Sequence, residues 1–186
     1  MKQSRIFEVY EKNKRLYTIN LVPGAKVYDE TLRKDGGKEF RDWNPSKSKL
    51  ASYIIKGAKN IFIRKDSVIL YLGASTGTTV SHVSDIVTEG LIFAVDLAPR
   101  VVRELLFLSQ KRKNIAPILE SASNIEELKK RISSVDVIYQ DLAQRNQLQI
   151  FLKNINAFLN PGGFAFLAVK ARSIDVTRKP KAIFNE

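Results

Sequence analysis

The sequence has no cysteine and a single histidine, His82, which limits the metal and redox sites that it can build. Without cysteine there is no disulfide framework and no thiolate metal site, and one histidine cannot form a histidine-rich cluster. No metal site is therefore expected. Long apolar runs are also missing: none reaches the roughly 18–20 residues that cross a bilayer. No apolar segment typical of a secretory signal follows residues 1–5, so the sequence predicts a soluble, intracellular protein.

What the sequence has in excess is positive charge. Its 186 residues include 31 lysines and arginines against 19 aspartates and glutamates, a formal net charge of +12 at pH 7. A hydrophobic share of 44% and a charged share of 27% are typical of a globular chain. Basic residues cluster at Lys12, Lys14 and Arg15, at Lys111-Arg112-Lys113, and at Arg172, Arg178, Lys179 and Lys181. Clustered charge suits a polyanion such as nucleic acid, with a lysine-rich surface that serves solubility as the alternative.

Two domains are expected, one over residues 1–45 and one over residues 46–186. The first is predicted to be a small β-rich lobe, because apolar residues flank the polar turn at 11–14, as in a hairpin. A second turn signal covers residues 34–38. Ser46 then predicts the N-cap of a helix that runs to about Ala58.

From residue 68 onward, short apolar runs alternate with helical patterns. Each run is typical of a buried strand, and each helical pattern repeats apolar residues at helical spacing. Strands are predicted at 68–72, 91–95, 117–119, 135–139 and 164–169, with helices around 80–87, 99–110, 125–132 and 146–159. This alternation predicts an α/β fold with a parallel, doubly wound sheet.

Two features at the first strand ends favour a nucleoside cofactor. The loop from Gly73 through Ala74 to Thr79 follows the first strand; its small residues let backbone approach a ligand at the next helix N-terminus. Its spacing matches neither the dinucleotide fingerprint nor a P-loop. Asp96 ends the second strand, where a carboxylate can accept both ribose hydroxyls. The alternatives are a turn that needs small residues for packing and an aspartate that caps the next helix.

Two further polar positions follow the fourth and fifth strands. Asp141 begins the run Asp141-Leu142-Ala143-Gln144 at the expected switch point of the sheet, where open α/β sheets bind ligands. Lys170 follows the apolar run at 164–169, which carries it to the same carboxyl edge.

Longer strings resemble the archaeal fibrillarin family. The string from Tyr71 to Asp85 resembles the first cofactor motif of that family, and the string from Arg41 to Leu50 resembles its signature before the methyltransferase domain. Strings at 98–106, 141–144 and 170–177 extend the similarity in order, so that it covers essentially all 186 residues.

The resemblance implies a Rossmann-like methyltransferase that transfers a methyl group from S-adenosyl-L-methionine to a ribose 2′-hydroxyl. It implies work on rRNA, with tRNA as a further substrate, inside a box C/D ribonucleoprotein of the cytoplasm, in pre-rRNA processing. The implied partners are a guide RNA, the target rRNA, a Nop-type scaffold protein and a kink-turn-binding ribosomal-type protein. The implied cofactor residues are Thr78, Thr79, Asp96, Leu97, Ser121, Ala122, Asp141, Leu142, Ala143 and Gln144, beside the loop residues Gly73 and Ala74.

The implied catalytic residues are Lys49, Asp141 and Lys170. A ribose hydroxyl is a poor nucleophile, so the enzyme must align it with the methyl donor and accept its proton. Either lysine could accept that proton, and Asp141 would orient them.

Two departures from the family pattern modify the expectation. Ser121-Ala122 stands where the family usually has Asp-Ala, which predicts weaker cofactor binding. The family also continues past Glu186 into strands that carry the histidine of its catalytic set, so the domain is expected to be shortened, with the fifth strand at an open edge. His82 belongs to the first cofactor motif instead. The alternative function is a weak or inactive subunit that binds scaffold and RNA structurally. A nicotinamide-dependent oxidoreductase ranks third, because the glycine spacing differs.

Overall fold

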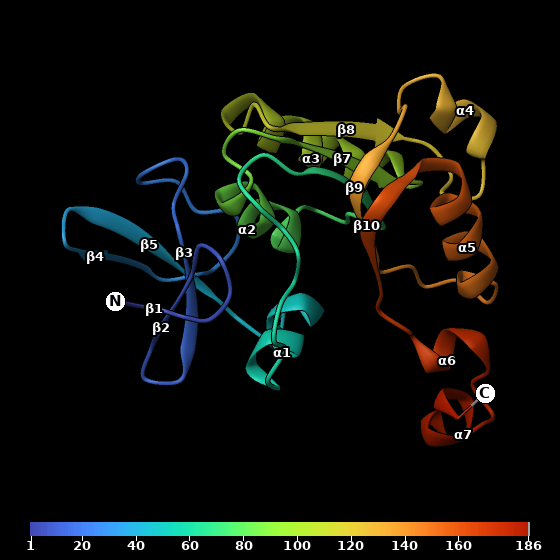
Figure 1. The fold of residues 1–186 in the computed structure, drawn as a ribbon, viewed down its shortest axis with the longest axis horizontal. Helices are drawn as coiled ribbons and strands as arrows, with labels where there is room; N and C mark the ends of the chain where they lie inside the picture. Colours follow the sequence, from blue (N-terminus) through green and yellow to red (C-terminus); the bar gives the residue numbers. More distant parts are fainter. Residues whose placement is uncertain (186) are drawn as a thin grey trace.

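The computed structural model describes residues 1–185, which form two five-stranded sheets with helices between and around them (Figure 1). The N-terminal sheet is antiparallel, in the order β1-β2-β3-β5-β4. Its strands are β1 (Lys2–Gln3), β2 (Val9–Lys12), β3 (Arg15–Ile19), β4 (Leu32–Asp35) and β5 (Lys38–Trp43). Both predicted turns are confirmed as two-residue hairpin turns. Asn13 and Lys14 have φ of 52° and 61°, and Gly36 and Gly37 have 56° and 77°, as the right-handed twist of hairpins favours.

The second sheet is parallel throughout, in the order β10-β9-β6-β7-β8. Its strands are β6 (Val68–Leu72), β7 (Leu91–Asp96), β8 (Ile115–Leu119), β9 (Val135–Gln140) and β10 (Leu159–Leu167). The chain starts at the central β6, moves outward through β7 and β8, and returns to β9 and β10 on the other side. The predicted doubly wound sheet is thus confirmed, and its switch point lies between β6 and β9.

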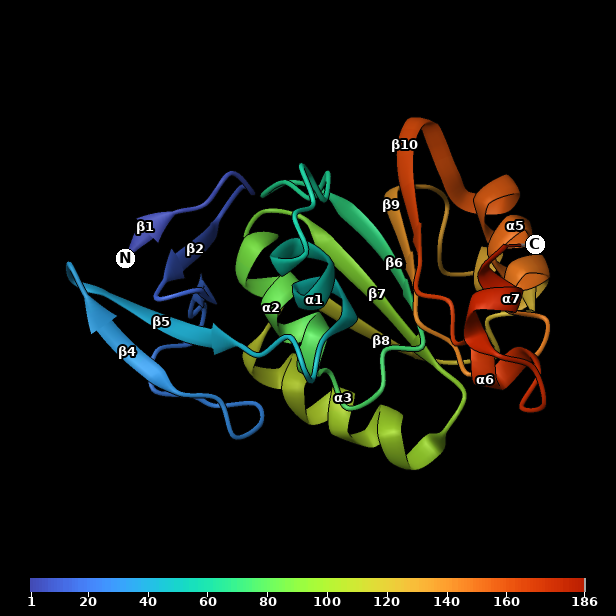
Figure 2. The same ribbon diagram turned by 90° about the horizontal axis from the view of Figure 1, so that it is seen from below.

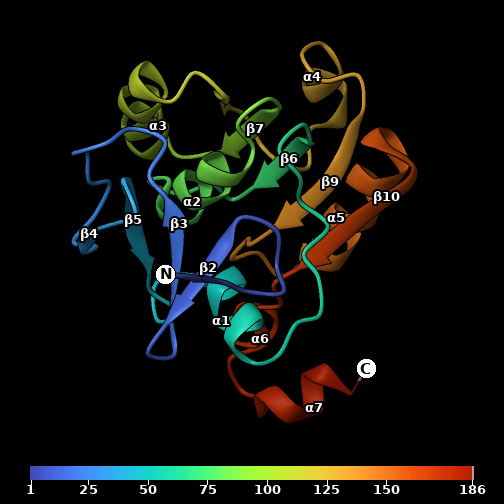
Figure 3. The same ribbon diagram turned by 60° about the vertical axis from the view of Figure 1, so that its left-hand side comes forward.

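Helices cover both faces of the parallel sheet (Figure 2). The helices of the molecule are α1 (Lys49–Ile55), α2 (Thr78–Ile86), α3 (Pro99–Lys111), α4 (Ile125–Lys129), α5 (Gln147–Phe158), α6 (Ala171–Ile174) and α7 (Pro180–Phe184), and the last two follow the end of β10. Buried residues of α1, α2 and α3 share one apolar cluster, and those of α4 and α5 share the other. In all three views α5 lies on the side away from the antiparallel sheet (Figure 3). None of the helices in residues 1–185 is long and apolar enough to cross a membrane.

The helix predicted from Ser46 to Ala58 is shorter than expected at both ends. Its N-cap is Ser48, whose hydroxyl accepts a hydrogen bond from the Ala51 N–H at 3.2 Å. Ser46 instead donates its N–H and hydroxyl to the side chain of Asn44, at 2.9 and 2.8 Å, and so belongs to the preceding turn. Gly57, with φ of 100°, ends the helix before Ala58.

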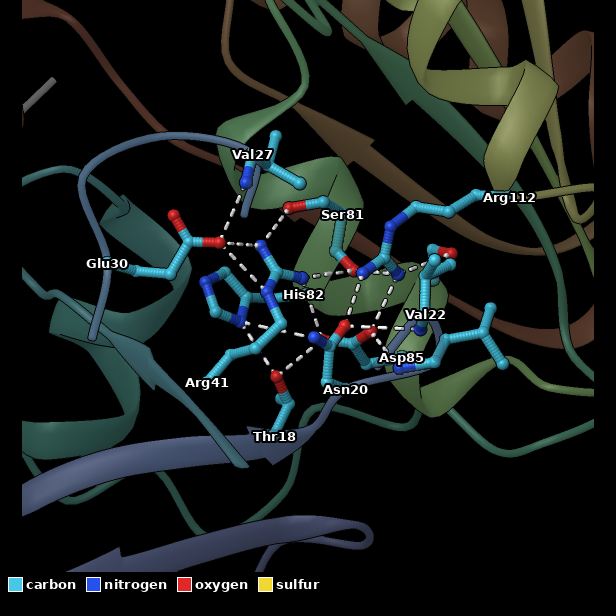
Figure 4. Close-up of polar contacts among 12 residues, drawn as sticks. Thr18, Asn20, Val22, Val27, Glu30, Arg41, Ser81, His82, Asp85 and Arg112 are labelled. Atoms are coloured by element: carbon cyan, nitrogen blue, oxygen red, sulfur yellow. Dashed lines mark hydrogen bonds and ion pairs between the residues drawn. The ribbon is translucent and has the colours of Figure 1, made fainter. Parts of the chain in front are cut away.

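A buried ion-pair network joins the antiparallel sheet to α2 and α3 (Figure 4). Arg41 of β5 pairs with Glu30 at 2.7 Å and with Asp85 of α2 at 2.8 Å. Arg112 pairs with the other Asp85 oxygen at 2.6 Å. Two cations therefore meet two anions inside the molecule. The expectation that Arg112 belongs to a basic surface cluster is wrong, because its side chain is only 2% exposed.

His82 of α2 lies in the same network, stacked on Trp43 with ring centroids 5.0 Å apart. The Thr18 hydroxyl donates to Asp85 at 2.7 Å, so it accepts from His82 Nδ1 at 2.8 Å. His82 Nε2 lies 2.6 Å from the Tyr28 hydroxyl, which also lies 2.9 Å from the Asp42 carbonyl oxygen. Burial lowers the pKa of His82 well below 6.5, and the nearby Arg41 lowers it further. His82 therefore serves as a neutral part of the packing between lobe and helix.

Candidate functional site

The structure brings the three predicted catalytic residues together at the carboxyl edge of the parallel sheet. Lys49 is the first residue of α1, Asp141 follows β9, and Lys170 lies just beyond β10. The Lys49 ammonium donates to both Asp141 carboxylate oxygens at 2.8 Å. Lys170 Nζ lies 3.0 Å from Asp141 Oδ1 and donates to the Asp141 carbonyl at 3.2 Å. One carboxylate therefore holds two lysines that arrive from distant parts of the chain.

This cluster is accessible to a substrate. The side chains of Lys49, Lys170 and Asp141 are 48%, 29% and 16% exposed. Two ammonium groups around one carboxylate leave a positive balance that suits a polyanionic ligand. The arrangement can also hold a hydroxyl group and pass its proton to an amine.

A cavity of about 260 Å³ adjoins Asp141 at the switch point. Its wall includes eight of the residues predicted to bind the cofactor: Gly73, Asp96, Leu97, Ala122, Asp141, Leu142, Ala143 and Gln144. These residues lie at or after the ends of strands β6, β7, β8 and β9, whose carboxyl ends share this edge of the sheet. The residues that were predicted at the ends of four strands therefore line one cavity.

Gly73 permits the close approach of two loops at this cavity. It has φ of 82°, and a Cβ atom there would lie 2.5 Å from the carbonyl oxygen of Asp141. Any other residue would push the loop after β6 away from the loop after β9. The glycine thus fixes the floor of the cavity beside Asp141.

Asp96 fixes the loop after β6 and the loop after β7 at the same cavity. One carboxylate oxygen accepts from the Ser75 N–H at 2.9 Å, and the other accepts from the Ala98 N–H at 3.1 Å. Ala98, rather than Asp96, is the N-cap position of α3. Since each carboxylate oxygen has a second lone pair, both remain able to accept a ligand hydroxyl.

Four predicted cofactor residues do not line the cavity: Ala74, Thr78, Thr79 and Ser121. Ala74 is buried in the apolar core, and Thr78 begins α2. The Thr79 hydroxyl donates to Ser48 at 3.0 Å, which ties α2 to the N-cap of α1 beside Lys49. Ser121 pairs its hydroxyl with that of Ser123 at 2.7 Å.

Three cavity residues are not among the predicted cofactor residues: Ser75, which lies in the predicted loop at 73–79, Val95 and Glu120. Glu120 matters most, because it brings a second carboxylate to the wall. Its N–H donates to the Asp96 carbonyl at 3.2 Å, and its Oε1 accepts from the Ser121 N–H at 2.7 Å. The signal was an acid directly after the third strand, the same pattern that identified Asp96 after the second.

A second cavity, of about 340 Å³, opens between α1 and β10. Lys49, Tyr53, Tyr139 and Phe166 are among its wall residues. Because Lys49 lines this cavity and Asp141 lines the first, their ion pair lies between the two. Two ligands in the two cavities would therefore meet at the lysine–aspartate cluster. Within residues 1–185 no group of three or more His, Cys, Asp or Glu side chains could hold a metal ion.

The chain is similar to a known protein family. The family model described as Fibrillarin matches residues 1–186. The fibrillarin-like rRNA/tRNA 2′-O-methyltransferase of Methanocaldococcus jannaschii is 52% identical over 192 residues, covering 100% of this chain and 84% of that protein.

Two solved structures are also similar. Aeropyrum pernix fibrillarin with natively bound S-adenosyl-L-methionine superposes with a TM-score of 0.84 and is 44% identical, covering 92% of this chain and 75% of that one. Fibrillarin in a fibrillarin/Nop5p complex superposes with a TM-score of 0.88 and is 40% identical, covering 100% of this chain and 84% of that one.

Proposed function

Because the chain belongs to the fibrillarin family, we propose that it methylates RNA at the ribose 2′-hydroxyl, with S-adenosylmethionine as the methyl donor. The substrate is rRNA, and tRNA in addition, as in the name of the Methanocaldococcus jannaschii relative. The observation that carries the proposal is the carboxylate of Asp141 held between Lys49 and Lys170, at the rim of the cavity described above. A purely structural subunit would not need this cluster.

The cavity residues fit an adenosyl ligand. Asp96 and Glu120 offer carboxylates for hydroxyl and amino groups, and Leu97, Ala122 and Leu142 offer apolar surface for a base. The close approach of loops at Gly73 leads from this cavity to Asp141. S-adenosylmethionine, when bound, supplies a methyl group carried by a positively charged sulfur.

The residues of the chain then handle the hydroxyl. Lys49 and Lys170 lie within 3.0 Å of the Asp141 carboxylate and can fix the position of a ribose oxygen. In its neutral form, either lysine accepts the hydroxyl proton as the oxygen attacks. Asp141 stabilises the ammonium that results and keeps both lysines oriented. Positioning and proton acceptance are thus assigned to one cluster.

The proposal extends to the assembly in which the chain works. A similar fibrillarin is complexed with Nop5p, which supports a Nop-type scaffold protein as a partner. We infer that a box C/D guide RNA selects the target nucleotide and that a kink-turn-binding protein completes the particle, in pre-rRNA processing in the cytoplasm. The net charge of +12 suits an RNA-containing complex.

The test is methyl transfer by the reconstituted particle. The chain is assembled with guide RNA, scaffold protein and kink-turn-binding protein, and labelled methyl groups are counted on the target RNA. Asp141→Asn should reduce transfer by about 10²-fold or more, the usual range for loss of acid–base positioning. Glu126→Gln, on an exposed ion pair of α4 with Lys129, should leave transfer unchanged.

A target RNA with a 2′-deoxy sugar at the selected nucleotide is the substrate control. Label on this RNA, or equal transfer by Asp141→Asn, would contradict the proposal. A particle that assembles fully but transfers no methyl group would favour the structural subunit instead.

A further inference from the structure

Gln147 contacts both Lys170 and the loop at 141–144 from a buried position. It is the first residue of α5 and is 1% exposed. Its side-chain oxygen accepts the Lys170 N–H at 2.9 Å. Its side-chain nitrogen donates to the carbonyls of Gln144 at 3.0 Å and Lys170 at 3.3 Å. One amide therefore binds both the backbone N–H and the backbone carbonyl of Lys170, a predicted catalytic residue.

Lys170 needs such a contact because it lies beyond the sheet. The ladder between β10 and β9 ends at the pair Leu167 and Gln140. One more backbone bond follows, from the Ala168 N–H to the Gln140 carbonyl at 2.8 Å. At Lys170 the amide of Gln147 takes the place of a neighbouring strand, since it offers one acceptor and one donor like a peptide group.

Gln147 is itself held through its backbone carbonyl. The side chain of Gln140, which is fully buried, donates to the Gln147 carbonyl at 2.6 Å. Gln140 is the last residue of β9 and directly precedes Asp141. The strand β9, which leads into Asp141, and the segment that carries Lys170 are thus joined through two side chains, those of Gln140 and Gln147.

We propose that Gln147 is a positioning residue that sets the place of Lys170 relative to Asp141 and to the loop at 141–144. The proposal rests on the function proposed above. A lysine side chain has a flexible four-carbon stem, so any movement of the Lys170 backbone adds to the uncertainty in the position of its ammonium group. An error of about 1 Å in a catalytic group can cost on the order of 10²-fold in rate. Gln147 supplies the support that the end of β10 lacks at this point.

The first experiment measures amide hydrogen exchange at Lys170 in the chain alone. Gln147→Met keeps the length of the side chain but removes its hydrogen bonds. Exchange at Lys170 should become roughly tenfold faster, the factor that an ordinary hydrogen bond allows. Gln149→Met, at an exposed position of the same helix, is the matched control and should leave the rate unchanged. Unchanged exchange in a folded Gln147→Met protein would overturn the proposal.

The second experiment separates positioning from general damage by turnover in the reconstituted particle. Gln147→Met should lower kcat roughly 10- to 100-fold and leave KM for the target RNA unchanged. Gln147→Glu keeps an acceptor for the Lys170 N–H, replaces the donors with a second oxygen and adds a buried acid, so in the folded variant Lys170 exchange should stay slow. This variant also serves if Gln147→Met fails to fold. Fast exchange at Lys170 in a folded Gln147→Glu protein would contradict the assignment.

The two readouts distinguish the two proposals. Exchange at Lys170 requires no turnover, so it tests the support from Gln147 directly. A wild-type particle without methyl transfer would contradict the proposed function. A Gln147→Met particle with wild-type kcat would contradict the role of Gln147 alone.

Discussion

Glu120 gives the cofactor cavity a carboxylate that Ser121 cannot provide. Its Oε1 is occupied by the Ser121 N–H and the Asn124 side chain, whereas no donor within residues 1–185 contacts its Oε2. If Asp96 takes the ribose, the base extends toward the end of β8, where Glu120 can accept its amino group. That Ser121 weakens cofactor binding stays a prediction, and Glu120 offers a physical reason for the opposite outcome.

Glu120→Ala should weaken binding of S-adenosylhomocysteine by roughly 1–3 kcal/mol, because it removes a charged acceptor of a hydrogen bond. Calorimetry on the isolated chain measures this directly. The inosine analogue lacks the amino group, so its affinity should change little in the same variant. Equal losses for the two ligands would show that Glu120 acts on the cavity as a whole rather than on the amino group.

His82 should make the stability of the protein depend on mildly acidic pH. Burial, with Arg41 next in effect, lowers its pKa well below 6.5 in the folded state. Above pH 6.5 the His82 ring is neutral in the folded and the unfolded protein, so its titration does not lower the free energy of unfolding. Below pH 6.5 the unfolded chain binds a proton that the folded chain resists, so stability falls by up to about 1.4 kcal/mol per pH unit.

Urea unfolding at several pH values between 5 and 7.5 checks this slope. Burial alone would raise the pKa of Glu30, but the Val27 N–H and the Arg41 guanidinium hold it below 4.5, so this carboxyl acts only at lower pH. His82→Gln should be less stable at pH 7.5 and should show a shallower slope. An identical slope in the variant would assign the pH dependence to other groups.

At the scale of elements, α1 matters because its first residue is Lys49. The Ser48 hydroxyl accepts from the Ala51 N–H and from the Thr79 hydroxyl. Ser48→Ala should therefore destabilise the protein by about 1 kcal/mol, which lowers the melting temperature by about 2–4 °C.

Ser46→Ala is the matched control for this cap. Ser46 was the cap predicted from the sequence, yet it is exposed and bonded to Asn44 in the preceding turn. Its replacement should stay within about 0.5 kcal/mol of the wild type, as is usual for surface positions. Thermal unfolding of the two variants side by side decides the point, and the reverse order would mean that the helix begins at Ser46.

Local patterns predicted what depends on neighbours in the sequence. The buried run at β6 and the acid at the end of β7 were visible as short motifs, and so was the small-residue loop that begins at Gly73. The roles of Arg112 and Gln147 were not visible. The contact of Arg112 with Asn20 spans 92 residues, and that of Gln147 with Lys170 spans 23. Only the assembled fold brings such partners together, and a surface and a buried arginine look alike in a sequence.

At the scale of the whole molecule, the buried network changes where the charge lies. Arg41 and Arg112 are balanced inside by Glu30 and Asp85, so these four residues add nothing to the field outside. The formal net charge of +12 is therefore carried by the remaining residues. Among them, Lys12 and Lys14 at the tip of the first hairpin are exposed, and so are Lys111 and Lys113 at the end of α3.

This distribution predicts how the isolated chain binds RNA. Without base-reading aromatic motifs, binding should be weak, indifferent to sequence and strongly dependent on salt. Each phosphate contact on a single strand contributes about 0.7 to the slope of log affinity against log salt. Replacing Lys111 and Lys113 by alanine should therefore reduce the slope by up to about 1.4 if both contact phosphates. Arg112, which lies between them in sequence but is buried, cannot contribute to this slope directly.

Fluorescence anisotropy with two unrelated single-stranded RNAs, titrated at several salt concentrations, measures both the slope and the selectivity. Lys129→Ala, which removes a cation already paired with Glu126 on α4, is the control for a generic loss of one charge. Strong discrimination between the two RNAs at a fixed salt concentration would mean that the chain reads bases itself. In that case the guide RNA would not be the sole source of selectivity. If the chain instead binds both RNAs alike, with a slope that falls in the double variant, target choice must enter through base pairing in the assembled particle.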